Sequence, residues 1–343
     1  MTAAEEVVTR PVPVVVLAEV LDGAFRAAGM GEEEAARVAD ALVSAETAGV
    51  PTHGVLRVPW YLDALASGAV RPAGQLRVQV RTPAVATVDG GGAYGYLPTW
   101  VALQSALAMA GSTGVACVAV HAVAEFGRAA YYAEAAADRD LVAVVCQNTQ
   151  PLVAAPGADA ATHGNNPLAF SGPGADAPVF DAAFTARSGG ELRRRALLGL
   201  PLPAEWGYVD AYGAPTTDPA RAMLAAQQAV GGAKGFGLAV LVDLLAGVLS
   251  SSASGPAVRP GVPEVGAVVL ALDPVAFGTT PERVAAQFSA GAQAVRTAGG
   301  RWPGDRARAA RRRAADRGEV EIPVPVLEAL AAAVGPGPAG RLA

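Results

Sequence analysis

The sequence predicts an α/β or α+β fold whose domains are interleaved along the chain. Hydrophobic residues make up 52% of the 343 residues and charged residues 17%, so a sizeable core is expected and global disorder is not. Segments typical of helices and of strands alternate, but without a regular strand–helix–strand rhythm, and no internal repeat is visible. Together these observations favour one large mixed fold.

The N-terminal part is typical of a helical region that follows a frayed tail of about ten residues. Helices are expected over residues 14–28, 32–47 and 60–66, with a further helical stretch that opens at Thr52-His53. Glu32, Glu33 and Glu34 would lie at the N-terminal end of the second helix, where the positive end of the helix dipole stabilises negative charge. Gly49 and Pro51 are expected to end this helix. Pro59 fits the first turn of the third.

Beyond Gly68 the pattern changes to alternating strands and helices. Strands are expected over residues 76–80, 84–88, 115–120, 141–146, 168–171, 179–184 and 266–272. Helices are expected over residues 99–110, 128–137, 237–249, 281–297, 306–313 and 324–334. Turn residues dominate 147–167 and 208–219, and 187–202 forms a charged excursion.

Charge and composition exclude several classes of function. The net charge is −5, and no basic bias of the whole chain favours nucleic acid or an anionic membrane as partner. The basic cluster at 306–313 fits a solvated helix face, although a cofactor phosphate could use one of its arginines. No apolar run of about 20 residues predicts a membrane span, and no signal peptide is recognisable, so a cytoplasmic protein is expected.

The chain has two cysteines, Cys117 and Cys146, which lie in apolar runs typical of buried strands. We expect core thiols in a reducing compartment rather than a disulfide framework. No CxxC or histidine-rich spacing is present, so no metal site is predicted.

The most informative motif is the hexapeptide Thr52-His53-Gly54-Val55-Leu56-Arg57, which holds one of only three histidines. His53 titrates near neutral pH, and Arg57 is a permanent cation. In a helix, residues four apart share a face, so both groups would point into the same space. Such a pair suits a substrate with a carbonyl beside a carboxylate. From the spacing alone, a solvated His–Arg pair on a helix surface is the simpler interpretation.

A glycine-rich segment, Gly90-Gly-Gly92-Ala-Tyr-Gly95, has the spacing of the dinucleotide-binding fingerprint after a strand-like segment. That fingerprint also needs an acidic residue about 20 positions further on, which holds the ribose hydroxyls. After Asp89 the next acid is Glu125, which is too far away. We therefore expect a glycine-rich turn here and no Rossmann site.

Several segments, taken in order, match one family. They are Thr52-His53-Gly54-x-x-Arg57, Val88-Asp89-Gly90, Phe126-Gly127, Asn148 with Pro151, Gly164-Asn165-Asn166-Pro167, Asp181, Trp206-x-x-x-Asp210, Pro215-Thr216-Thr217-Asp218-Pro219, Lys234-Gly235-Phe236-Gly237-Leu238 and Leu272-Asp273-Pro274. Their order and spacing resemble the malate/L-lactate dehydrogenase family that does not use a Rossmann fold. The resemblance covers residues 15–335, and its motifs are specific only jointly.

The resemblance implies a fold and an activity. The fold has interleaved domains, and NAD or NADP lies on a mostly antiparallel sheet. The activity is hydride transfer between the nicotinamide and a small-molecule substrate, either a 2-oxo/2-hydroxy acid or a cyclic 2-imino acid. A homodimer is implied as well. The basic cluster at 306–313 favours NADP over NAD only weakly.

The resemblance also implies roles for single residues. His53 matches the acid/base histidine, Arg57 the group that holds the substrate carboxylate, and Asp181 the aspartate that orients the histidine, with Thr52 as a candidate for the substrate pocket. Cofactor contacts are implied for the segments that contain Asn148, Thr149, Asn165, Asn166, Pro167, Lys234 and Gly235. Taken singly, Asn148 and Asn166 also fit ordinary turn residues, and Lys234 a solvated cation.

The sequence departs from the family where a second active-site histidine is usual. In the corresponding stretch, residues 122–127, Glu125 takes the place of that histidine; when ionised it accepts hydrogen bonds but does not donate them. Glu125 could pair with an amino, iminium or guanidinium group of an unusual substrate. It could instead mark a scaffold that has lost redox turnover, either a non-redox enzyme or a cofactor-binding pseudoenzyme. It could also be a tolerated replacement that forms a salt bridge.

The expected division of the chain has three parts. Residues 1–80 form an N-terminal helical part that carries His53 and Arg57. Residues 81–225 form the cofactor-binding sheet domain. Residues 226–343 form a helix-rich part that packs back on the first and completes the site.

Overall fold

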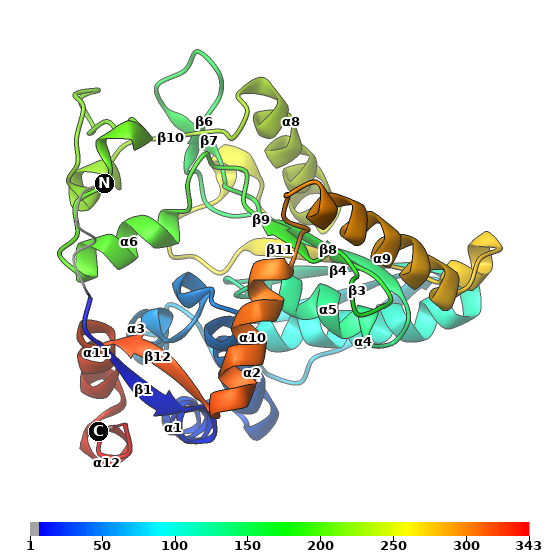
Figure 1. Cartoon of the computed structure of the whole chain (residues 1–343), viewed down its shortest axis with the longest axis horizontal. Helices are drawn as coiled ribbons and strands as arrows, with labels where there is room; N and C mark the ends of the chain where they lie inside the picture. The colour runs from blue at the N-terminus through cyan, green and yellow to red at the C-terminus, as the bar shows by residue number, and fades with distance from the viewer. Residues whose placement is uncertain (1–6, 343) are drawn as a thin grey trace. The chain divides into compact units, whose positions relative to one another are not determined.

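The computed structural model describes residues 7–342, which form two compact units (Figure 1). The first unit contains the residues up to 66, 187–226 and those from 307 on. The second contains 67–186 and 227–306. Each unit is thus assembled from separate stretches of chain, and the mixed, interleaved fold class predicted from the sequence is confirmed.

The first unit is mainly helical. Its helices are α1 (Val14–Ala27), α2 (Glu32–Thr47), α3 (Val58–Ala66), α6 (Gly189–Leu197), α7 (Pro219–Ala222), α11 (Val324–Val334) and α12 (Pro336–Ala339), with most of α10 (Asp305–Arg317). Strand β1 (Thr9–Pro13), near the N-terminus, pairs antiparallel with β12 (Glu319–Pro323), near the C-terminus. The side chains of Leu17, Leu21, Phe25 and Leu42 are fully buried, and they fix α1 against α2.

The second unit is built on a seven-stranded sheet with the order β2-β3-β4-β11-β5-β8-β9. Its strands are β2 (Val78–Thr82), β3 (Val85–Ala93), β4 (Val115–Val123), β5 (Val142–Gln147), β8 (Leu168–Ser171), β9 (Phe180–Ala182) and β11 (Val265–Leu272). Within this sheet only β3 and β4 pair in parallel, so the predicted, mostly antiparallel sheet is confirmed. A small second sheet contains β6 (Val153–Ala154), β7 (Ala161–His163) and β10 (Gln227–Gln228).

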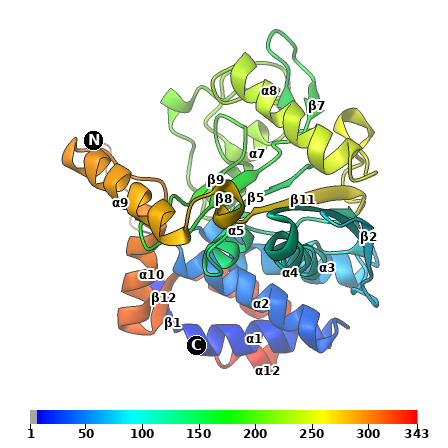
Figure 2. The same cartoon turned by 90° about the vertical axis from the view of Figure 1, so that its right-hand side faces the viewer.

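Helices cover both faces of the large sheet (Figure 2). On one face lie α4 (Tyr96–Thr113) and α5 (Ala130–Ala137), and on the other lies α8 (Ala233–Val242), while α9 (Pro281–Thr297) follows later in the chain. The residues that pack against α8 include Ala119, Cys146 and Val268. The residues next to them in the same strands, Val118, Val145 and Val269, are also buried. Burial on both faces explains the continuous apolar runs in the sequence.

Two expectations about secondary structure are wrong in detail. Residues Thr9–Pro13 form strand β1 instead of a frayed end, because β12 supplies a pairing partner; residues 1–6 of the expected tail lie outside the described residues. The helix expected over 237–249 begins earlier, at Ala233, and changes after Val242 into a π-helical turn, Asp243–Val248. Such turns are rare and often occur at functional sites.

Candidate active site

His53 and Arg57 lie in two consecutive 3₁₀ turns of the first unit, Pro51–His53 and Val55–Arg57. The expected continuous helix is therefore wrong here. Gly54 separates the turns with φ −99° and ψ −144°. A Cβ atom at this position would overlap the carboxyl group of Glu46, so a side chain here would force that carboxyl group to move.

Thr52 connects the two candidate residues. Its Oγ1 lies 3.1 Å from Nδ1 of His53, and its carbonyl oxygen accepts a hydrogen bond of 2.8 Å from Nε of Arg57. Arg57 is buried and His53 is half-buried. The short turn, rather than a helix face, therefore holds both side chains in fixed orientations.

Glu46, which the sequence analysis did not single out, holds the backbone of this loop. Its Oε1 accepts a hydrogen bond of 2.8 Å from the N–H of Val55. Burial raises the pKa of this carboxyl group to about 7, against the opposing effects of that hydrogen bond and of the Arg194 charge. A carboxyl group that titrates near neutral pH thus lies directly beneath Gly54.

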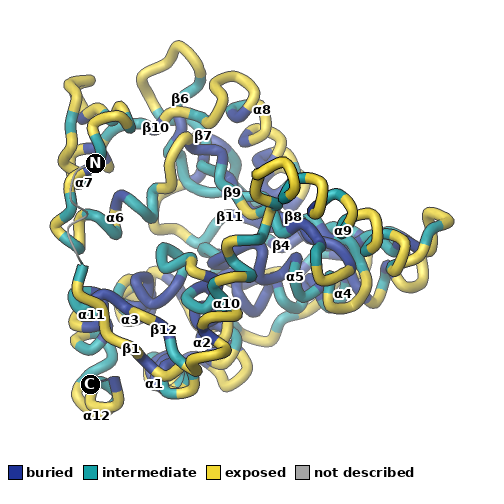
Figure 3. The backbone as a smooth tube through the Cα atoms, viewed as in Figure 1, coloured by how far each residue is buried: buried dark blue, intermediate teal, exposed yellow. Residues whose placement is uncertain are grey.

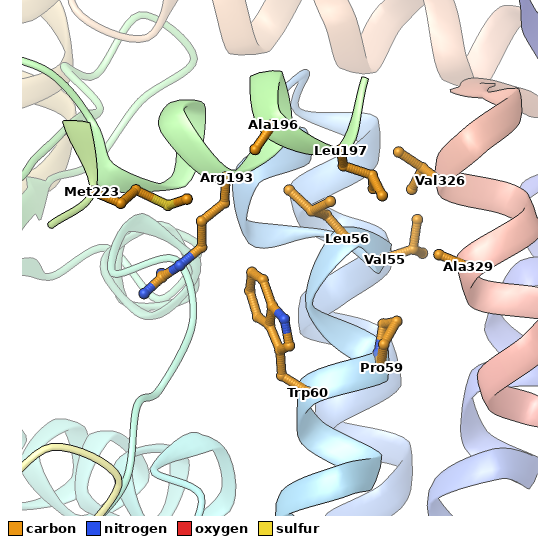
Figure 4. Close-up of a pocket in the computed structure, with 10 residues that line it drawn as sticks. All are labelled: Val55, Leu56, Pro59, Trp60, Arg193, Ala196, Leu197, Met223, Val326 and Ala329. Carbon is orange, nitrogen blue, oxygen red and sulfur yellow. The ribbon is translucent and has the colours of Figure 1, made fainter. Parts of the chain in front are cut away.

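An apolar pocket of about 490 Å³ opens beside the same loop (Figure 4). Its walls are Val55, Leu56, Pro59, Trp60, Arg193, Ala196, Leu197, Met223, Val326 and Ala329. The Arg193 guanidinium lies over the Trp60 ring at 5.1 Å from the ring centroid. The pocket therefore presents one cation on an otherwise apolar surface.

In the second unit, the predicted cofactor residues Asn148 and Asn166 belong to one buried network. Nδ2 of Asn148 donates to Oδ1 of Asp243 at 3.2 Å, and Nδ2 of Asn166 donates to Oδ2 of Asp243 at 2.8 Å. The N–H of Gly255 donates to the same carboxylate at 3.1 Å. Asp243 opens the π-helical turn and was not found from the sequence, because its donors lie up to 95 residues away.

The remaining polar atoms of these two amides also bind protein groups. Oδ1 of Asn148 accepts from the N–H of Gly266 at 2.9 Å, and Oδ1 of Asn166 accepts from the N–H of Thr149 at 2.9 Å. Asn166 has a φ of +42°, a conformation that asparagine tolerates better than most residues. Both side chains therefore shape the backbone of the loops around them.

The other predicted cofactor residues lie along the same loops. Oγ1 of Thr149 donates to Oδ1 of Asn165 at 2.8 Å, and the carbonyl oxygen of Pro167 accepts from the N–H of Gln147. Lys234 is exposed in the first turn of α8. A Cβ atom on the next residue, Gly235, would overlap the Val230 carbonyl oxygen, so this close approach requires glycine.

His163 is a further residue of this region that the sequence analysis did not single out. It lies on β7, half-buried, and its ring meets that of Phe236 edge to face at a centroid distance of 5.1 Å. Oγ1 of Thr162 lies 3.0 Å from its Nδ1. Its place directly before Gly164-Asn165-Asn166 was the one available signal.

Glu125 lies in the loop after β4, and the side chain of Gln147 forms hydrogen bonds with the backbone of the residues on both sides of it. The buried amide of Gln147 accepts from the N–H of Phe126 at 3.2 Å and donates to the carbonyl oxygen of Ala124 at 3.0 Å. A Cβ atom on Gly95 would press against Phe126. The last glycine of the rejected fingerprint therefore serves the close packing of this loop.

Asp181 lies on β9 and caps the start of α5. Its Oδ2 accepts from the N–H of Ala130 at 2.8 Å and lies 3.8 Å from Nε of Arg128. Arg128 also forms a salt bridge with Glu134. Burial raises the pKa of the Asp181 carboxyl group to about 6, and the Ala130 N–H and the Arg128 charge oppose this effect.

Replacing Asp181 with asparagine is expected to stabilise the protein above pH 6. A raised pKa means that ionisation of Asp181 costs more in the folded than in the unfolded chain, so this cost appears as the pH rises from 3.8 to about 6. Asparagine keeps an oxygen for the Ala130 N–H and removes the charge, for a gain of about 1–2 kcal/mol at pH 8. Urea unfolding of both proteins between pH 4.5 and 8 measures it. A stability difference that does not vary with pH would contradict this reasoning.

Residues 7–342 contain no cluster of histidine, cysteine, aspartate and glutamate side chains suited to a metal ion. Within the same described range, no helix has the length and apolar character needed to cross a membrane.

Comparison with known proteins relates this geometry to a family. Residues 12–331 match the family model described as malate/L-lactate dehydrogenase. The L-sulfolactate dehydrogenase of Methanothermobacter thermautotrophicus is 34% identical over 78% of this chain and 80% of its own length. The (2R)-3-sulfolactate dehydrogenase (NADP⁺) of Chromohalobacter salexigens is 33% identical over 90% of this chain and 93% of its own length. The Δ1-pyrroline-2-carboxylate reductase of Pseudomonas fluorescens is 32% identical over 88% of this chain and 91% of its own length.

Solved structures agree with this assignment. A dehydrogenase from Sinorhizobium meliloti superposes with a TM-score of 0.86 at 29% identity, over 96% of this chain and 99% of its own. The Δ1-piperideine-2-carboxylate reductase of Pseudomonas syringae pathovar tomato superposes with a TM-score of 0.81 at 30% identity, over 95% of this chain and 100% of its own. The resemblance seen in the motifs is thereby confirmed, and the chain belongs to the malate/L-lactate dehydrogenase family.

Proposed function

We propose that this protein is a nicotinamide-dependent reductase or dehydrogenase that acts on a small 2-oxo or cyclic 2-imino acid. His53 donates or accepts the proton, and Arg57 binds the substrate carboxylate. The turn that fixes both side chains on Thr52 is the observation that carries the proposal. Arginine suits the carboxylate because its planar guanidinium can donate two parallel hydrogen bonds. The role predicted for Asp181 stays a prediction.

The cofactor supplies the hydride, and the protein supplies its binding and orientation. The residues present fit NAD or NADP. The loops that contain Asn148, Thr149, Asn165, Asn166 and Pro167 are held by buried amides. The first turn of α8, which contains Lys234 and Gly235, has N–H groups that receive no partner from within the helix. Such groups suit pyrophosphate oxygens. We propose that the asparagines position this backbone.

Transfer of a deuteride tests the activity directly. The protein is mixed with NADH or NADPH deuterated at C4 and with a panel of 2-oxo acids and cyclic 2-imino acids, which includes Δ1-pyrroline-2-carboxylate. Mass spectrometry then searches for deuterium at C2 of the product. A labelled product supports the reductase. Cofactor binding without label transfer to any member of the panel would favour the non-redox scaffold instead.

We further propose that Glu125 lines the substrate pocket and favours substrates that carry a basic nitrogen. An anion near a substrate carboxylate repels it by about 1 kcal/mol or more at close range, whereas an iminium or ammonium group would be attracted. Two relatives are named as reductases of cyclic imino acids, which contain such a nitrogen. We therefore propose a nitrogen-bearing substrate as the preferred one.

A Glu125→His variant is expected to change this preference. Without the negative charge, kcat/KM for the cyclic imino acid should fall by about tenfold relative to that for a simple 2-oxo acid. Steady-state kinetics on both substrates measure the ratio. Glu125→Gln is the matched control, because it keeps the size and removes the charge, and it should shift the ratio in the same direction. An unchanged ratio in both variants would remove the charge-pairing idea.

We also propose that the protein is a cytoplasmic homodimer. Apart from Lys234 and the buried Asp243, the helical segment from α8 through the π-helical turn is apolar on all sides, and most of α8 is exposed (Figure 3). Its exposed large apolar residues are Leu238, Val240, Leu241, Leu244, Val248 and Leu249. A helix that is apolar on all sides is normally buried. These residues carry no charge, so they can face a copy of themselves across a two-fold axis. Both cysteines are free thiols, as suits the cytoplasm.

A Leu241→Glu variant is expected to be monomeric. A buried glutamate would face its symmetry copy without a partner, which costs several kcal/mol of association free energy. Analytical ultracentrifugation at micromolar concentration measures the mass of the wild type and of the variant. Val275→Glu is the control, because Val275 is also exposed but lies on another turn. A monomeric wild type, or a dimeric Leu241→Glu variant, would contradict the proposed interface.

A further inference from the structure

Glu46 lies on the last turn of α2, and its carboxyl group reaches forward to the loop that carries His53 and Arg57. The hydrogen bond from the Val55 N–H is 2.8 Å long and joins residues nine positions apart. Val55 stands between the two candidate residues, directly after Gly54. The lack of a side chain at Gly54 is what lets the carboxyl group lie against the backbone there.

The loop makes several other backbone hydrogen bonds, and each of them is local. The N–H of His53 donates to Val50 at 3.0 Å, that of Gly54 to Pro51 at 3.2 Å, and that of Arg57 to Gly54 at 3.1 Å. The Val55 N–H donates instead to a side chain of a long, regular helix. Glu46 thus links the loop to the helical scaffold of the first unit.

We infer that Glu46 is a positioning residue for the loop that carries His53 and Arg57, and that it acts by holding the Val55 N–H. The inference rests on the proposed function, since the loop matters only if His53 and Arg57 serve the reaction. A misplaced proton donor costs rate even when its chemistry is unchanged.

The charge on Glu46 adds a dependence on pH. Its pKa is raised to about 7 by burial, so the carboxyl group is partly protonated near neutral pH. The charged group that acts on it is Arg194 on α6, which favours the carboxylate and forms a salt bridge with Glu191. In the loop, His53 and Arg57 stand two positions before and after its partner Val55. A hydrogen bond to an ionised carboxylate is stronger than one to the neutral acid, so the loop is held more firmly above pH 7.

Two substitutions separate anchoring from charge. Glu46→Ala removes the acceptor and should lower kcat about 10- to 100-fold. Glu46→Gln keeps a carbonyl oxygen for the Val55 N–H and should restore most of kcat at its optimum pH. In the reductive direction, wild-type kcat should rise with pH as Glu46 ionises and fall as His53 deprotonates. In the Glu46→Gln variant only the falling limb should remain.

Hydrogen exchange gives a readout that does not need turnover. Mass spectrometry of a peptide that contains Val55 should show exchange about tenfold faster in Glu46→Ala than in the wild type or Glu46→Gln, at one pH. Glu34→Gln is the matched control, because Glu34 is a buried glutamate in the first turn of the same helix. It should change neither the loop exchange nor the pH profile.

The outcomes distinguish the two levels of the argument. Unchanged loop exchange in Glu46→Ala would overturn the inference, and so would a rising limb that persists in Glu46→Gln. Altered exchange with no turnover on any substrate would leave the anchoring supported and would refute the proposed function instead. If Glu46→Ala does not fold, the pH profile of Glu46→Gln still decides: loss of the rising limb supports the inference, and its persistence overturns it.

Discussion

A His53→Ala variant is expected to lose turnover by about 10²–10⁴-fold while it still binds the nicotinamide cofactor. The His53 imidazole is the one side chain of residues 52–57 that suits general acid–base catalysis, and reduction of a carbonyl or an imine needs a proton at the moment when hydride arrives. The loop stays anchored, since the Val55 N–H still meets Glu46 and Arg57 still donates to the Thr52 carbonyl. Single-turnover kinetics, together with fluorescence titration of NADH and NADPH, separate the two effects.

His121→Ala is the matched control for this experiment. His121, in the second unit, is also a partly exposed histidine. Its Nδ1 lies 3.7 Å from Oδ1 of Asp89. Its removal is expected to leave kcat within about twofold, because a surface ion pair contributes less than about 1 kcal/mol. Full turnover in His53→Ala, or an equal loss in both variants, would refute the assigned role of His53.

An Asp243→Ala variant is expected to lose about 3–5 kcal/mol of unfolding free energy, because three buried donors lose their common acceptor at once. These donors are the amides of Asn148 and Asn166 and the N–H of Gly255. The loops around them should loosen, so the affinity for the cofactor should fall as well. Urea unfolding followed by tryptophan fluorescence measures the stability, and calorimetric titration measures the affinity.

Asp273→Ala provides the comparison for this loss. Asp273 also accepts from a backbone N–H, that of Val275 at 2.9 Å, but it does so at an exposed turn. Loss of such a cap costs about 1 kcal/mol. Equal losses in Asp243→Ala and Asp273→Ala would show that the buried network adds nothing to the stability of the protein.

Much of the fold could be predicted because the signals are local or are repeated along the chain. Val118, Val120 and their neighbours form an unbroken apolar run, which is typical of a strand covered on both faces. The glutamates that open α2 lie exactly where a helix dipole favours them. The family could be identified because its motifs, weak one by one, occur together in the right order.

The failures have a common physical cause: the deciding partner lies outside the local sequence pattern, whether it is nine positions away, as Glu46 is from Val55, or 312, as Glu321 is from Thr9. Strand β1 was missed because Thr9 is paired with residues near Glu321, 312 positions away. Glu46 and Asp243 act on loops that only the folded chain brings to them. In the candidate site, Gly54 was predicted to be part of a helix, whereas it separates two 3₁₀ turns and has the Glu46 carboxyl group where a Cβ atom would lie. Periodicity carries no information about such partners.

The order of strands in the large sheet has a consequence for synthesis of the protein. Strand β11 lies between β4 and β5, yet it follows them late in the chain, and 118 residues separate Asn148 from its partner Gly266. On the ribosome, β4 and β5 therefore emerge long before the strand that joins them. Their open edges can pair with other chains until residues 265–272 arrive. A chain that stops before Val265 should aggregate, however well its earlier helices form.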